Sequence, residues 1–169
     1  MKLKYQEIEN LPPLAWLADV SDGTAAVLHG SNVETKDTFF VEGAWAGEFS
    51  EGGFAESEWF CGTGGQLSSS GITFSTPSHM TSALFVSSDS GRILISNSHN
   101  FLCAYAGFQP DPQYLNYETD FNTILFGIHK YKSAIHLLNG TVSIYYFRTV
   151  HITDDGVMTV TLKEKSQCK

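Results

Sequence analysis

Cysteine is the residue type in this chain whose chemistry a catalytic site would use most directly. The chain has three cysteines, and Cys61 stands just before the glycine-rich run Gly62-Thr63-Gly64-Gly65. Backbone N–H groups beside a thiol can lower its pKa, so Cys61 is the candidate nucleophile of a hydrolase. A nucleophilic cysteine also needs a base, and the sequence assigns none. A buried structural role for Cys61 is the competing interpretation.

The glycine-rich run could also cradle an anion. No helix pattern opens after it and no Lys-Ser or Lys-Thr pair follows, so it meets neither the P-loop nor the dinucleotide fingerprint. Residues 62–71 are rich in glycine and serine and predict a mobile loop.

Metal binding has little support in the sequence. The six histidines are isolated, with no second histidine four residues away and no neighbouring cysteine ligand. Cys103 falls on the apolar face of a predicted helix, where a cysteine is most simply a small core residue. The sequence therefore predicts no metal site and no cofactor.

Aromatic residues gather between Phe39 and Phe60. One interpretation is a sheet core, and the other is a surface that binds a sugar or a protein partner. The candidate binding residues are Trp45, Trp59 and Phe49. Of the two tryptophans, Trp59 is expected in the core because Phe60 and Cys61 flank it, and Trp45 is expected at an interface.

The bulk composition excludes several classes of function. The chain has 169 residues, of which 42% are hydrophobic and 17% charged, and its formal net charge is −8. Its few Lys and Arg residues are scattered, whereas nucleic acids and anionic membranes require a concentrated basic face. No stretch approaches the ~20 apolar residues that span a bilayer, and no apolar run follows the first charges. We expect a cytoplasmic protein with free thiols.

The pattern of short β-branched and aromatic runs separated by turns predicts the fold. Residues 82–96, 135–147 and 150–162 each read as a hairpin, the second around an Asn139-Gly140 type I′ turn. Residues 97–107 and 117–128 predict two short helices. The expected fold class is α+β, a layered sandwich of mainly antiparallel β-sheets with two short helices. We expect a single domain over residues 1–169, with an amino-terminal arm or extended edge segment at 1–13 and the β-rich domain at 14–169.

Residues 38–147 resemble the amino-terminal domain of asparagine synthetase-like proteins, a class II glutamine amidotransferase domain of the Ntn type. The run at 40–49 resembles that family's hydrophobic strand leading into a Gly-x-Phe element. Residues 82–98 resemble its paired strands around an Asp-Gly turn and the helix start that follows. Residues 114–142 resemble its short helix and closing hairpin.

The chain also departs from the family pattern. The family's nucleophile is a cysteine at the mature amino terminus, whereas Lys2 stands here and no cysteine precedes Cys61. The Arg-Gly and Asn-Gly-Glu motifs and the synthetase domain have no counterpart. The resemblance therefore implies a non-catalytic amidotransferase-like domain or subunit that packs on an asparagine synthetase-like or ATP-pyrophosphatase chain.

The sequence leaves two alternatives open. One is a β-rich carbohydrate- or protein-binding module that uses the Trp45 and Trp59 region. The other is a hydrolase that depends on Cys61. The expected partner is a protein, either a synthetase-type chain or a second copy, with no nucleic acid and no membrane.

Overall fold

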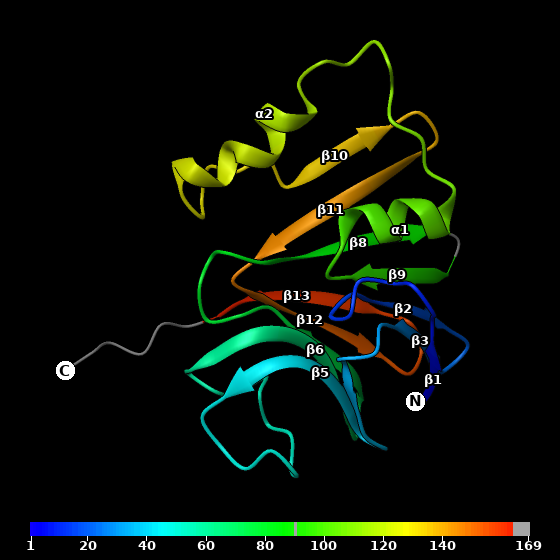
Figure 1. Cartoon of the computed structure of the whole chain (residues 1–169), viewed down its shortest axis with the longest axis vertical. Helices are drawn as coiled ribbons and strands as arrows, with labels where there is room; N and C mark the ends of the chain where they lie inside the picture. Colours follow the sequence, from blue (N-terminus) through cyan, green and yellow to red (C-terminus); the bar gives the residue numbers. More distant parts are fainter. Residues whose placement is uncertain (90, 164–169) are drawn as a thin grey trace, which may run out of the picture.

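Two β-sheets lie face to face in this protein, and two short helices cover the outer face of the larger sheet (Figure 1). The computed structural model describes residues 1–89 and 91–163. The larger sheet has, in spatial order, the strands β1 (Lys2–Glu7), β3 (Thr24–His29), β2 (Trp16–Ser21), β9 (Arg92–Ser96), β8 (Ala83–Asp89), β11 (Gly140–Tyr146) and β10 (Ala134–Leu137). The smaller sheet has the strands β13 (Met158–Leu162), β12 (Arg148–Thr153), β7 (Gly71–Ser75), β6 (Phe60–Ser68), β5 (Phe39–Trp45) and β4 (Glu34–Thr35).

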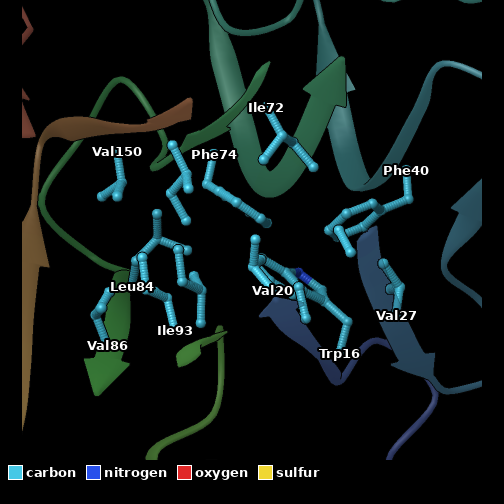
Figure 2. Close-up of a cluster of buried hydrophobic side chains, with 14 of the residues drawn as sticks. Trp16, Val20, Val27, Phe40, Ile72, Phe74, Leu84, Val86, Ile93 and Val150 are labelled. Carbon is cyan, nitrogen blue, oxygen red and sulfur yellow. The ribbon is translucent and has the colours of Figure 1, made fainter. Parts of the chain in front are cut away.

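The main core fills the space between the sheets. Trp16 from the larger sheet packs against Phe40 and Phe74 from the smaller one, with ring centroids 4.9 and 6.0 Å apart. Figure 2 shows these side chains with valine, leucine and isoleucine residues pointing between the sheets. Because successive strand residues face opposite sides, each sheet contributes every second residue to this core.

Three smaller hydrophobic clusters lie on the outer faces of the sheets, one on the smaller sheet and two on the larger sheet. The helix α1 (His99–Ala106) buries Leu102 against Leu17 and Leu94 of the larger sheet. The side chain of Ser98 caps this helix and Gly107 ends it in the left-handed conformation. The helix α2 (Tyr117–Asn122) and the 3-10 turn η1 (Thr123–Phe126) follow it along the chain.

The predicted α+β class, with mainly antiparallel sheets and two short helices, is confirmed. The three predicted hairpins are present as β8–β9, β10–β11 and β12–β13. Ser90, in the turn of the first hairpin, lies outside the described residues. The predicted arm at residues 1–13 contains β1, which pairs in parallel with β3 at one edge of the larger sheet.

The predicted mobile loop at 62–71 is wrong, because residues 60–68 form β6 and strand β7 begins at Gly71. The glycines serve close packing here. A Cβ at Gly65 would lie 2.7 Å from the Phe40 ring, and one at Gly64 would lie 2.4 Å from the Phe40 carbonyl oxygen. Small residues in this strand therefore let it approach β5 and let the core aromatics lie flat against it.

The predicted type I′ turn at Asn139-Gly140 is also wrong. Leu137 pairs with Gly140, so the two loop residues are Leu138 and Asn139, and neither Asn139 nor Gly140 has a positive φ. Gly140 is instead restricted by space, because a Cβ there would lie 2.4 Å from the Phe108 ring.

Candidate functional site

The candidate site lies on the inner face of the smaller sheet, where β6 begins and β5 ends. Strand alternation places Cys61 and Thr63 of β6 on this face, opposite Ala44 and Glu42 of β5. Thr63 is buried, whereas Ala44 and Cys61 are exposed. The inner face is therefore covered by the larger sheet at Thr63 and open to solvent two residues further along.

A buried chain of hydrogen bonds closes the inner end of the site. The Trp16 indole Nε1 donates to the Thr63 hydroxyl at 2.8 Å, and this hydroxyl donates to Glu42 Oε1 at 2.7 Å. Asn97 Oδ1 accepts from the Trp16 backbone N–H at 2.9 Å. Trp16 belongs to the larger sheet and Thr63 to the smaller one, so the bond between their side chains fixes the two sheets relative to each other.

The Glu42 carboxyl is the titratable group of this chain of bonds. Burial raises the pKa of Glu42 above its ordinary value, and hydrogen bonds from Thr63 and Asn97 partly oppose that rise. A carboxyl held in this way favours its neutral form more than a solvated one does.

Cys61 is exposed and carries a free thiol. Within residues 1–89 and 91–163, no histidine or carboxylate forms a hydrogen bond with its sulfur, and the Glu42 carboxylate on the neighbouring strand is bonded to Thr63. The geometry of the described site thus presents a thiol without the base that nucleophilic catalysis requires.

Trp59 lies beside Cys61 at the open end of the site, and its predicted place in the core is wrong. Its side chain is 75% exposed. Ala46 donates its N–H to the Trp59 carbonyl oxygen at 3.1 Å, so the ladder between β5 and β6 continues through this residue. Phe60 takes the buried position on the outer face, and alternation then turns Trp59 and Cys61 to the inner face beyond the cover of the larger sheet.

Trp45 was expected at an interface, and this prediction is wrong too, because only 8% of the residue is exposed. Its indole Nε1 donates to the Gly52 carbonyl oxygen at 3.1 Å. Its ring meets Phe39 and Phe54 edge-on on the outer face of the smaller sheet. Phe49 stacks on Trp45 with centroids 4.1 Å apart and remains half exposed. The three candidate binding residues are therefore divided, with Trp59 on one face and Trp45 and Phe49 on the other.

A thiol–imidazole contact on α1 escaped the sequence reasoning. Cys103 Sγ lies 3.5 Å from His99 Nε2. Residues four apart on a helix are neighbours, so the spacing of these two residues was the available signal. Burial raises the pKa of Cys103 to about 11 and lowers that of His99. Both groups are therefore neutral near pH 7, which is the opposite of an activated thiolate–imidazolium pair.

A cavity of about 170 Å³ beside β10 was also missed. Tyr114, Tyr117, Lys132 and His136 contribute to its lining. Lys132 forms an ion pair with Asp120, and the Tyr114 hydroxyl donates to the same carboxylate at 2.7 Å. The polar groups of this lining are largely engaged with one another, so the structure points to no ligand for it.

In the part of the chain that the structure describes, no three His, Cys, Asp or Glu residues come together as metal ligands would. None of its helices has the length and apolar character needed to cross a bilayer. Comparisons with family models, curated proteins and solved structures give no match.

Proposed function

We propose that this chain is a non-catalytic glutamine amidotransferase-like domain that packs on a partner of the asparagine synthetase-like or ATP-pyrophosphatase type. The observation that carries the proposal is the composition of the open inner face. It holds an exposed tryptophan, Trp59, beside an exposed thiol, Cys61, that has no base among its described hydrogen-bond partners. Such a face suits recognition more than catalysis.

The physical argument for a protein partner rests on Trp59. A large aromatic side chain exposed to water is a typical hot-spot residue, because it buries much apolar area on binding and loses little rotamer entropy. The hydrogen bonds of Trp16, Thr63 and Glu42 hold the neighbouring part of the β5–β6 pair against the larger sheet. A partner that covers Trp59 would therefore meet a preformed surface.

The fold and the expected partner suit this proposal. Two facing and mainly antiparallel sheets agree with the layered sandwich expected of an amidotransferase-like domain. A partner of the ATP-pyrophosphatase type uses ATP, so the proposal places the complex in the cytoplasm.

The test is affinity capture with the full chain and two alanine variants. The native chain should capture a synthetase-type or ATP-pyrophosphatase-type protein from a lysate of its source, identified by mass spectrometry. Trp59→Ala should lose this partner. Leu125→Ala, which removes an 84% exposed side chain in η1, should keep it. Equal capture by both variants, or capture of no such protein, would refute the proposal.

A carbohydrate-binding module is a second candidate, because an exposed indole such as Trp59 can also stack on a sugar ring. Saturable binding of an oligosaccharide by the isolated chain, lost in Trp59→Ala, would favour it. A hydrolase is a third candidate, because Cys61 is exposed. It requires a turnover that Cys61→Ala alone abolishes.

A further inference from the structure

The smaller sheet ends in a strand edge that differs from the other three sheet edges. Native proteins blunt exposed edges with charges, short strands or covering groups. The edge strand β1 carries Lys2, Lys4 and Glu7, and β4 has only two residues. At β10 the Tyr117 hydroxyl donates to the His136 carbonyl oxygen. The strand β13 has five residues and no charged side chain.

The pairing of β13 with β12 shows which of its backbone groups face outward. Lys163 N–H donates to the Phe147 carbonyl oxygen, and Thr153 N–H donates to that of Val157. In an antiparallel ladder hydrogen-bonded pairs alternate with non-bonded pairs, so Thr159 and Thr161 bond with β12. The N–H and C=O groups of Met158, Val160 and Leu162 therefore point away from β12, to an edge where no strand of residues 1–89 or 91–163 pairs with β13.

The sequence of this strand is symmetric about its centre. Met158-Thr159-Val160-Thr161-Leu162 alternates apolar residues with threonine in the same way from either end. Two copies in antiparallel register about Val160 would bring apolar residues opposite apolar residues and threonine opposite threonine, which are favourable cross-strand pairs. This register also matches the outward backbone groups, because Val160 then forms a hydrogen-bonded pair with Val160 of the second copy.

Charge favours the same arrangement. Each chain carries a net charge of −8, so two copies repel each other over most of their surfaces. The paired strands would bring no charged side chains together. The acidic turn residues Asp154 and Asp155 precede β13, and antiparallel pairing sends the two turns to opposite ends of the joined strands. At about 3.4 Å per residue they would be roughly 34 Å apart, well beyond the ~8 Å screening length.

We propose that β13 is a self-association edge, through which two copies of this chain pair strand to strand about a two-fold axis at Val160. The partner is a second copy because the outward hydrogen-bonding groups, the apolar–threonine alternation and the lack of charge are all self-complementary. A two-fold interface is the usual form of such association. The inference is independent of the proposed function, since strand β13 contains neither Trp59 nor Cys61.

The first test is sedimentation velocity of the full chain over a range of concentrations. The native chain should show a concentration-dependent dimer. Thr159→Lys/Thr161→Lys places like charges directly opposite across the pair and should weaken dimerisation about tenfold or more. Ser69→Lys/Ser70→Lys adds the same charge in the exposed turn between β6 and β7 and should leave dimerisation unchanged. A native chain that is monomeric throughout, or an equal response of both variants, overturns the proposal.

The second test reads the register and does not depend on weakening the fold. Positions 159 and 161 of two copies would form a non-hydrogen-bonded pair, with Cα atoms about 4.5 Å apart, within disulfide range. An equimolar mixture of Thr159→Cys and Thr161→Cys chains should form an intermolecular 159–161 disulfide, identified by mass spectrometry, with the native chain as the control for its own thiols. If either variant alone links with itself as readily as the mixture does, or if no link forms, the proposed pairing is wrong.

Discussion

Trp45 and Trp59 show how the environment of a residue follows from its place in a strand pair. The two lie near the same end of the β5–β6 ladder, yet Trp45 is buried and Trp59 is exposed. Trp45 shares the outer face with Phe39 and Phe54, whereas Trp59 shares the inner face with Cys61. Neighbouring residue types alone suggested the reverse, because they do not reveal which face of a sheet is covered.

The first prediction concerns the stability of these two positions. Trp45→Ala should lower the free energy of unfolding by about 3–5 kcal/mol, because it leaves a cavity among aromatic side chains. Trp59→Ala should change it by no more than about 0.5 kcal/mol, because the side chain is exposed. Urea denaturation of the two variants measures the difference. A loss of stability in Trp59→Ala that equals the loss in Trp45→Ala would mean that Trp59 is also packed in the native protein.

The second prediction concerns the pH dependence that Glu42 confers. Its pKa is raised in the folded protein, so the folded state holds a proton that the unfolded state has released above the ordinary value of 4.5. Stability from this group is fully present below that pH and is lost as pH rises toward the raised pKa. Glu42→Gln should therefore become more stable relative to the native chain as pH rises through this window. Unfolding free energies of both proteins at matched pH values measure this trend. A constant difference between them would show that the Glu42 pKa is not raised.

At the scale of elements, the hairpins could be predicted from sequence and strand β6 could not. The turns at 89–91 and 154–156 combine Asp with Gly, which is a local signal that two short strands reverse direction. Gly64 and Gly65 carry the same local signal for a turn but lie within β6. They are required there by the Phe40 ring and backbone on the neighbouring strand, a contact that the local sequence does not contain.

The third prediction separates two explanations of Gly140. The sequence suggested that it needs a positive φ, whereas the structure shows that the Phe108 ring leaves no room for a side chain. Gly140→Ala should cost about 1–3 kcal/mol of stability by overpacking. In a Phe108→Ala background the same change should cost much less. A double-mutant cycle in urea measures the coupling between the two sites. Equal costs in both backgrounds would favour a backbone requirement at Gly140.

At the scale of the whole molecule, the candidate site depends on the meeting of two sheets. Its inner end is a chain of hydrogen bonds between the sheets. Trp16 and Asn97 come from the larger sheet and its continuation, and Thr63 and Glu42 come from the smaller sheet. Trp16 is 47 positions away from Thr63 in the sequence and 81 positions away from Asn97, and it forms a hydrogen bond with each of them. The glycine-rich neighbours of Cys61 were enough to select it as a candidate from the sequence. The chain of hydrogen bonds near it could not be predicted in this way, because its residues come together only in the folded protein.

The final prediction is that the chain releases no ammonia from glutamine at rates typical of enzymes. The open end of the inner face exposes the Cys61 thiol. Attack of a thiol on an amide also needs a base that takes the proton from the nucleophile and returns it to the leaving amine. No described side chain supplies this base to Cys61 by a hydrogen bond, and the His99–Cys103 contact lies on α1 with both groups neutral near pH 7. A coupled ammonia assay on the purified full chain, with Cys61→Ala and Cys103→Ala as matched variants, makes the measurement. Turnover of about 1 per second or faster that disappears only in Cys61→Ala would show that this open face is an active site.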